Sequence, residues 1–290
     1  MTEICGQTFE GERALFHSTD IQLTDCIFQN GESPLKECEG IVAANCEFGW
    51  KYPVWYCKNV EITNSIWQET ARAGVWYAEN ILVKNAVVHA PKNFRRCRNL
   101  QLEAVSLSKA EETLWHCSKV HLRDVSAKGD YFGMDSEDLY IDGLKLDGNY
   151  PFDGCRNVEV HNSRLLSKDA FWNCENVVVY DSYISGEYLG WNSKNVKLVR
   201  CTIESLQGMC YIENLVLEDC ELVNTTLAFE YCTVDAQITG TADSILNPTS
   251  GTIRAEHIGK LILEPDRIDP SKTTILCETV DERLGRVVYE

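Results

Sequence analysis

Hydrophobic and polar residues alternate in short segments that return along most of the chain. The segments "NVEIT" (59–63), "NVEVH" (157–161) and "NVVVY" (176–180) each place apolar residues two positions apart. This spacing predicts strands, because alternate side chains of a strand lie on opposite faces. A second apolar pair follows shortly afterwards, as in "SIW" (65–67), and predicts a second, shorter strand.

The segments keep a nearly constant register. We define position 0 of a repeat as the residue just before its first apolar strand residue. Position 0 recurs at intervals of 19 to 21 residues, at Asp20, Gly40, Asn59, Asn80, Asn99, Lys119, Asp138, Asn157, Asn176, Asn195, Asn214 and Thr233. Another Asn or Asp stands five residues later in most repeats. Because Asn and Asp tolerate left-handed backbone, both positions predict corners, where stacked amides can bond from repeat to repeat.

Each repeat therefore holds short strands and corners within about 19 residues. A β-sandwich does not fit, since its strands are longer and are joined by hairpin turns. Helical repeats do not fit either, because the 3.6-residue periodicity of helices is absent. The pattern predicts an all-β solenoid in which each repeat is one coil, with equivalent residues stacked about 4.8 Å apart.

The "NVxIxNSxI" segments resemble those of right-handed parallel β-helix proteins of the pectate-lyase-like superfold, over about residues 13 to 240. The chain as a whole resembles a family of uncharacterised bacterial β-helix proteins, known only as a domain of unknown function. The resemblance implies a right-handed, single-stranded parallel β-helix, and the repeats counted above give about 12 coils of about 19 residues. It brings no catalytic motif. A pentapeptide-repeat solenoid is the structural alternative.

The two ends of the chain depart from the repeat. Residues 1–12 are expected to cap the first coil, within a β-helix that spans residues 1–240. Residues 241–290 are expected to form the final coil or coils and a C-terminal cap of the same domain. Within them, "GTIRAEHIGKLIL" (251–263) predicts further strands, and "TTILC" and "RVVYE" are two strands that could pair near the end.

Composition narrows the possible partners. The net charge of -17 argues against binding nucleic acid or an acidic membrane through a basic surface. The first residues lack the pattern of a signal peptide, and no run of apolar residues is long enough to span a membrane. We therefore expect a cytoplasmic protein whose fourteen cysteines are reduced. No C-x-x-C or nucleotide-binding motif occurs, so no cofactor or metal is expected.

A column of small residues stands two positions before position 0. It is mostly Cys, but Ala78, Ser136 and Ser193 replace Cys in three repeats. Stacked thiols could bind a soft metal or form disulfides. The replacement of Cys by Ala and Ser in some repeats favours a packing role instead, because Cys also behaves as a small buried hydrophobe.

Two neighbouring columns could carry chemistry. Four residues before position 0 the chain repeats Trp, at Trp55, Trp76, Trp115, Trp172 and Trp191. This column could be a platform for sugar rings, or aromatic stacking that needs no ligand, and the sequence leaves both interpretations open. In the central repeats Arg95, Met134 and Asp153 replace Trp, next to Arg96, His116 and Asp135. This change of character suggests a polar site on a rigid scaffold, and a charge-paired surface patch is the alternative.

These residues allow two reaction schemes. In glycoside hydrolysis, Asp135 and Asp153 would be the two carboxylates that flank the scissile bond. In a lyase reaction, Arg96 or Lys128 would remove the proton next to a uronate carboxylate, and the other cations would neutralise that carboxylate. His116 could serve either scheme. The expected catalytic residues are Asp135, Asp153, His116 and Arg96, and the expected binding residues are Arg95, Trp115, Trp76, Trp172 and Lys128.

Two classes of function remain open. The first is a protein that binds or processes an oligosaccharide or sugar acid, as a hydrolase, a lyase or a binding module. The second is a non-enzymatic acidic scaffold, which could imitate DNA. The outward residues of the first strands, among them Leu82, Tyr140 and Val178, could also form the surface of a homodimer.

Overall fold

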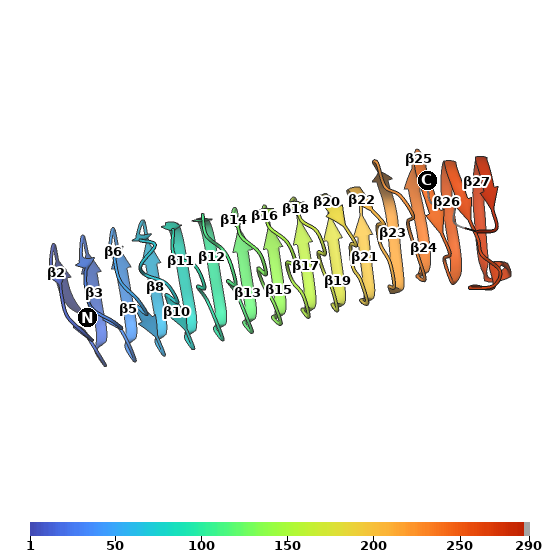
Figure 1. Cartoon of the computed structure of the whole chain (residues 1–290). Coiled ribbons are helices and arrows are strands. Elements are labelled where there is room, and N and C mark those ends of the chain that lie inside the picture. The colour runs from blue at the N-terminus through green and yellow to red at the C-terminus, as the bar shows by residue number, and fades with distance from the viewer. Residues whose placement is uncertain (287–290) are drawn as a thin grey trace. The chain divides into compact units, whose positions relative to one another are not determined.

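The computed structural model describes residues 1–286, and it is an all-β parallel solenoid with about 19 residues in each coil. Its strands form ladders in which successive coils pair in parallel (Figure 1). The chain divides into two compact units, Met1–Gly148 (unit 1) and Asn149 onwards (unit 2), which we describe separately.

In unit 1, each coil contributes one strand to a long parallel ladder. These first strands are β1 (Thr2–Cys5), β3 (Thr19–Thr24), β5 (Glu39–Ala44), β8 (Lys58–Thr63), β11 (Glu79–Val88), β12 (Arg98–Leu107), β13 (Ser118–Arg123) and β15 (Glu137–Asp142). The register places Ile41 beside Val60, Val60 beside Ile81 and Ile81 beside Leu100. All four side chains are buried, so the alternation seen in the sequence builds one continuous core column.

The second strands of the coils in unit 1 form another parallel ladder, which follows the corner at the end of the first strands. It contains β2 (Thr8–Phe9), β4 (Ile27–Phe28), β6 (Glu47–Phe48), β9 (Ile66–Trp67), β14 (Ser126–Lys128), β16 (Lys145–Asp147) and the distal halves of β11 and β12. A short third pair is formed by β7 (Val54–Trp55) and β10 (Val75–Trp76). Inside the coils Phe28, Phe48 and Trp67 stack with ring centroids 5.3 and 4.7 Å apart. This aromatic column fills the core at the second ladder.

Unit 2 repeats the same arrangement. Its first strands are β17 (Arg156–His161), β19 (Glu175–Tyr180), β21 (Lys194–Val199), β23 (Glu213–Leu222), β24 (Thr233–Thr239), β26 (Ser250–Ile262) and β27 (Thr273–Leu284). Its second strands are β18 (Arg164–Leu166), β20 (Tyr183–Glu187), β22 (Thr202–Leu206) and β25 (Thr241–Leu246). The one helical element of the described residues is a 3₁₀ turn, η1 (Pro270–Lys272).

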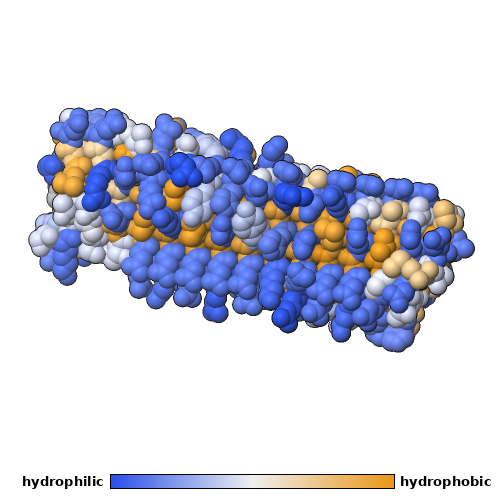
Figure 2. All heavy atoms as spheres, turned by 180° about the vertical axis from the view of Figure 1, so that it is seen from behind, coloured by the Kyte–Doolittle hydropathy of each residue, from blue (hydrophilic) through white to orange (hydrophobic). Residues whose placement is uncertain are grey.

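The corners expected from the Asn columns are confirmed. Position 0 has left-handed backbone, with φ of 55° at Asn59 and 57° at Asn80. The amide of Asn80 donates to Asn59 at 2.8 Å, and the amide of Asn99 donates to Asn80 at 2.8 Å. In unit 2, Asn195 donates to Asn176 at 2.9 Å. Hydrophilic side chains run in rows over the coils in Figure 2, with hydrophobic atoms visible between the rows.

The cysteine column packs in the core, as its exchange with Ala and Ser suggests. The thiols of Cys57 and Cys117 lie against carbonyl oxygens of the preceding coil, at 2.8 and 3.0 Å. The hydroxyl of Ser136 makes the equivalent bond at 2.7 Å, which explains why Ser replaces Cys there. All fourteen cysteines are free.

The number of coils differs from the expected twelve, because fifteen first strands stack in the two units together. The extra N-terminal coil is β1, which pairs in register with β3 although residues 1–12 looked like a cap. The extra C-terminal coils are β26 and β27. The sequence pattern fails at the first of these coils for two reasons. Ser250 lies opposite Thr233 but follows Thr233 by 17 residues rather than 19, and it is not the Asn that usually marks a corner.

Of the two terminal strands considered, "TTILC" is the beginning of β27. In "RVVYE", residues 287–290 lie outside the described residues. Within residues 1–286, no helix has the length and apolar character needed to cross a membrane.

Candidate functional site

The two columns that lie three and four residues before position 0 both face outward. The residue three before position 0 is left-handed in most coils, with φ of 51° at Arg96, 53° at His116 and 52° at Asp135. A strand in regular conformation would point neighbouring residues to opposite faces. The left-handed residue breaks this alternation, so Arg95 and Arg96 are both outside the coil, the first half-buried and the second exposed.

The Trp column of unit 1 is occupied by its own neighbours. Trp55 and Trp76 stack with centroids 5.1 Å apart and planes 6° apart. The indole N–H of Trp76 donates to the carbonyl oxygen of Lys92 at 2.8 Å, and that of Trp115 donates to Tyr131 at 2.6 Å. A sugar ring would pack on the face of an aromatic ring, but here the faces meet the next coil and the edges meet solvent. This geometry favours the stacking interpretation of the column.

Arg95 takes part in the same stack. Its guanidinium lies between two indoles, 5.1 Å from the ring centroid of Trp76 and 4.2 Å from that of Trp115. It also donates to the carboxylate of Glu112 at 2.6 Å, and its side chain is only 16% exposed. Burial would raise the pKa of Glu112, but the hydrogen bonds and charges of Arg95 and Lys92 lower it. Arg95 thus replaces a Trp in the column and is already fully engaged.

The structure brings three of the expected catalytic residues together. Arg96, His116 and Asp135 occupy the same position on successive coils, because the Arg96 N–H bonds to Trp115 and the His116 N–H bonds to Met134. The Nδ1 atom of His116 lies 3.8 Å from a carboxylate oxygen of Asp135, and both side chains are more than 40% exposed. The row is therefore an exposed corner of the coil.

The other expected residues lie elsewhere. Lys128 is on the second strand of its coil, where it forms an exposed ion pair with Asp147 at 3.3 Å. Asp153 and Trp172 belong to unit 2. Asp153 accepts a hydrogen bond from Asn173 at 2.8 Å, and Trp172 packs against Trp191 with centroids 5.8 Å apart. The pairing of Asp135 with Asp153 joins residues of different units and stays a prediction.

One hollow of unit 1 opens on the first ladder. Its volume is about 310 Å³, and its lining consists of Gln101, Leu102, Glu103, His121, Leu122, Arg123, Tyr140 and Asp142. Its main charges already pair, since Glu103 accepts from Arg123 at 2.8 Å and lies 3.3 Å from the Lys84 ammonium. Slight burial opposes ionisation of Glu103, but these two cations lower its pKa.

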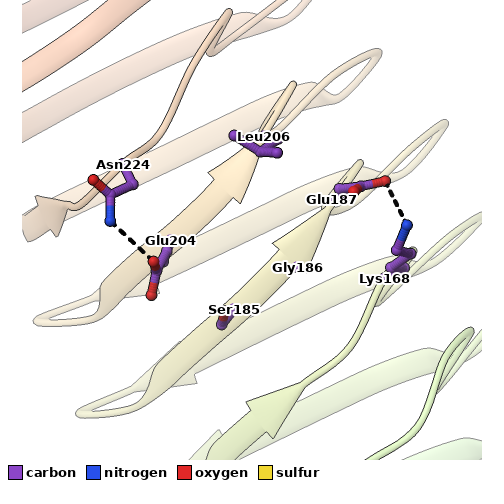
Figure 3. Close-up of a pocket in the computed structure, with 7 residues that line it drawn as sticks. All are labelled: Lys168, Ser185, Gly186, Glu187, Glu204, Leu206 and Asn224. Carbon is purple, nitrogen blue, oxygen red and sulfur yellow. Dashed lines mark hydrogen bonds and ion pairs between the residues drawn. The ribbon is translucent and has the colours of Figure 1, made fainter.

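A second hollow lies in unit 2, on the outer side of β20 and β22 (Figure 3). Its volume is about 280 Å³. Figure 3 shows the Asn224–Glu204 pair on one side and the Lys168–Glu187 pair on the other, with Ser185 and Gly186 between them. Leu206 completes the lining, and its side chain is 51% exposed.

Gly186 explains why this surface is hollowed. A Cβ atom at this position would lie only 1.8 Å from the carbonyl oxygen of Ser167 on the neighbouring coil. Only glycine therefore permits β20 to lie this close to Ser167, the residue that follows β18. The resulting stretch of bare backbone forms the floor between the polar side chains.

Glu204 is held in place by two donors. Its carboxylate accepts a hydrogen bond from the Tyr183 hydroxyl and another from the Asn224 amide at 3.0 Å. These two hydrogen bonds lower the pKa of Glu204, so the group is ionised at neutral pH. The Tyr183 ring in turn lies under the guanidinium of Arg164, with 4.2 Å between the Arg164 Cζ and the ring centroid.

Sequence reasoning missed this hollow, although a signal was present. The second strand has two or three residues in the earlier coils and five in β20 and β22. The strand lengthens where "YISGE" (183–187) and "TIESL" (202–206) continue to alternate into the loop region. The carboxylates of these extensions lie outside the columns before position 0, from which the candidate residues were predicted.

Two thiols of the Cys column are poor candidates for reactive groups, and no metal centre is formed by residues 1–286. These residues contain no group of three or more His, Cys, Asp or Glu side chains placed to hold a metal ion. Burial raises the pKa of Cys57 and of Cys174 to about 12, which makes both thiols poor nucleophiles.

Comparison with known proteins gives a family. A family model described as "Protein of unknown function (DUF3737)" matches residues 2–276. No curated protein matches the chain.

Three solved structures illustrate the likeness in fold. The mannuronan C-5 epimerase AlgE4 A-module of Azotobacter vinelandii is 8% identical, with 99% of this chain and 88% of that chain covered and a TM-score of 0.31. The tailspike of E. coli bacteriophage HK620, in complex with a hexasaccharide, is 11% identical over 96% and 71%, with a TM-score of 0.34. QnrB1, a plasmid-mediated fluoroquinolone resistance protein, is 15% identical over 77% and 90%, with a TM-score of 0.25. At these identities the likeness concerns the fold alone.

Proposed function

The chain belongs to the DUF3737 family, whose function is unknown, and we propose that it binds an oligosaccharide in the hollow of unit 2. The observation that carries this proposal is the carboxylate of Glu204, held by Tyr183 and Asn224 at the side of a hollow whose floor is Gly186. A polar acceptor that is fixed before the ligand arrives loses little conformational entropy on binding.

The lining offers what a sugar requires. Each sugar hydroxyl both donates and accepts hydrogen bonds, and the hollow presents the acceptors Glu187 and Glu204 beside the donors Lys168 and Asn224. The exposed Leu206 can pack against the C–H face of a sugar ring. Two carboxylates and one ammonium leave a net negative lining, which favours a neutral oligosaccharide over a sugar acid.

The same geometry supports binding rather than cleavage. Hydrolysis of a glycosidic bond needs a carboxylic acid that is protonated at the working pH, because it must donate a proton to the leaving oxygen. Glu204 accepts two hydrogen bonds that lower its pKa, and Glu187 pairs with the Lys168 ammonium at 3.0 Å, so neither carboxyl group of the hollow is suited to donate that proton. We therefore propose a binding protein.

Calorimetry against a panel of neutral oligosaccharides tests the proposal. With the ligand identified, Glu204→Gln and Asn224→Ala are each expected to weaken its affinity by about ten- to a hundredfold, since each removes a hydrogen bond that involves a charged group. Glu175→Gln is the matched control, because it removes an exposed carboxylate of the same unit that does not line the hollow.

Two results would refute the proposal. The first is that the folded wild-type protein binds none of the neutral oligosaccharides. The second is that it binds one with an affinity that Glu204→Gln and Asn224→Ala leave unchanged, which would place the site elsewhere.

A further inference from the structure

Four cationic or ionisable side chains gather on two neighbouring coils of unit 1. Arg96 and Arg98 belong to one coil, and His116 and Lys119 belong to the next. The two coils are joined by the bond from the Arg96 N–H to Trp115 at 2.9 Å and by the pairing of Arg98 with Ser118. All four side chains are exposed at the corner that leads into β12 and β13.

Three of these cations have no counter-ion. Within residues 1–286, neither Arg96, Arg98 nor Lys119 forms an ion pair or a side-chain hydrogen bond, whereas Arg95 beside them is tied to Glu112. Elsewhere in the same unit, exposed Lys92 and Arg123 both pair with a carboxylate. In a chain of net charge -17, a group of unpaired cations is unexpected if the surface serves solubility alone.

The position of Lys119 strengthens this inference. Position 0 carries Asn in the two preceding coils, and their amides bond from coil to coil. Lys119 has the same left-handed backbone, with φ of 55°, but its side chain has no amide to donate to Asn99. Position 0 of the next coil is Asp138, so the ladder of Asn amides ends at Asn99. A lysine is less suited to this corner than Asn, and it directly follows Ser118, which pairs in register with Arg98.

We propose that Arg96, Arg98, His116 and Lys119 bind the phosphate group of a phosphomonoester. Guanidinium groups bind phosphate oxygens through two parallel hydrogen bonds, and an ammonium adds a compact charge. Ser118 pairs in register with Arg98 and is partly exposed, so its hydroxyl can donate a further hydrogen bond. A phosphomonoester carries nearly two negative charges at neutral pH, which suits several cations better than the single charge of a carboxylate.

Nearby carboxylates favour a ligand with a single phosphate group. Asp135 lies 3.8 Å from His116, and Glu79 pairs in register with Arg98 on the preceding coil. Carboxylates on both sides would repel the neighbouring phosphates of a nucleic acid strand. The inference is independent of the oligosaccharide proposal, since it rests on residues of unit 1 alone.

Calorimetric titration with inorganic phosphate and with glucose 6-phosphate, at constant ionic strength, tests this site. The double variant Arg96→Gln/Arg98→Gln is expected to weaken phosphate binding at least tenfold, and Lys119→Gln should weaken it several-fold. Arg123→Gln is the matched control, because it removes one exposed positive charge of the same unit that is already paired. It should leave the affinity within twofold of the wild type.

Three results would overturn the proposal. One is the absence of any heat of binding with either phosphate compound. Another is an equal loss of affinity in Arg123→Gln, which would mean that only overall charge matters. The third is an equal response to chloride, which would mean that the cations are merely screened. Circular dichroism of each variant shows that it is folded before titration.

Discussion

The pair of adjacent residues Arg95 and Arg96 allows a sharp test of the structure. The two side chains have the same chemistry and lie next to each other in the sequence. Arg95 lies between two indoles and bonds to Glu112, whereas Arg96 is exposed and has no side-chain partner within residues 1–286. We predict that Arg95→Ala destabilises the protein substantially and that Arg96→Ala changes its stability by less than about 0.5 kcal/mol.

The magnitude for Arg95→Ala follows from its contacts. Two cation–π contacts at a partly buried site contribute about 1–2 kcal/mol together. The ion pair to Glu112, which is about a third exposed, contributes on the order of 1 kcal/mol. The sum is about 2–3 kcal/mol. For a chain of this size we expect the melting temperature to fall by roughly 4–12 °C.

The effect should also depend on pH. The folded protein holds the pKa of Glu112 below its usual value, so the contribution of Glu112 is present above the unfolded-state pKa and is lost as the pH falls through the folded-state pKa. The penalty of Arg95→Ala should therefore shrink below about pH 4.

Thermal melts of the two variants and the wild type, followed by calorimetry or circular dichroism, provide the measurement. They are recorded at pH 7 and at the lowest pH where the protein still melts cooperatively. Equal shifts for Arg95→Ala and Arg96→Ala at pH 7 would refute the arrangement described here, as would a larger shift for Arg96→Ala.

Three further predictions follow from individual contacts. Asn80→Ala should lower the free energy of unfolding by about 1–2 kcal/mol, because it removes two side-chain hydrogen bonds of the Asn ladder and places Ala in left-handed backbone. Urea melts test this prediction, and an unchanged free energy of unfolding would contradict it. Of the fourteen thiols, only Cys5 and Cys277 should react rapidly with a thiol reagent in the native protein, and the rest only after denaturation; rapid labelling of more than two would contradict the burial. Burial raises the pKa of Asp169, and one of its oxygens has no hydrogen bond, so its charged form destabilises the fold as the pH rises above the unfolded-state pKa. Asp169→Asn should thus raise the melting temperature at pH 7 by a few degrees and not at pH 4, and a loss of stability at pH 7 would contradict this.

Much of the fold could be predicted because its determinants are local. The alternation in "NVEIT" sets which side chains face inward, and the Asn at position 0 sets the corner, so each coil is specified within about 19 residues. The two C-terminal coils could not be counted in this way. Their strands β26 and β27 are held by pairing with the coil before them, and their corners lack the Asn that marks the others.

The candidate site was harder to predict. A column of residues in the sequence shows which side chains stack from coil to coil, but not which of them remain free to contact a ligand. Trp76 stood out as a member of the Trp column, and Arg95 and Arg96 stood out where the central repeats change character. The structure engages Trp76 and Arg95 with neighbouring coils and leaves Arg96 exposed. The partner of Arg95 is Glu112, which lies 17 residues away in a loop without a regular pattern.

The sequence by itself determined the coil, its corners and the column to which each residue belongs, since these depend on contacts within one repeat and on the repeat's regular spacing. Only the tertiary structure decided which outward side chains are already bound to their neighbours and where the surface is hollowed. The hollow of unit 2 exists because Gly186 lies against the Ser167 carbonyl of the adjacent coil while Asn224 reaches Glu204 from the other side. Such contacts join loops of different length, and no periodic pattern within a single repeat records them.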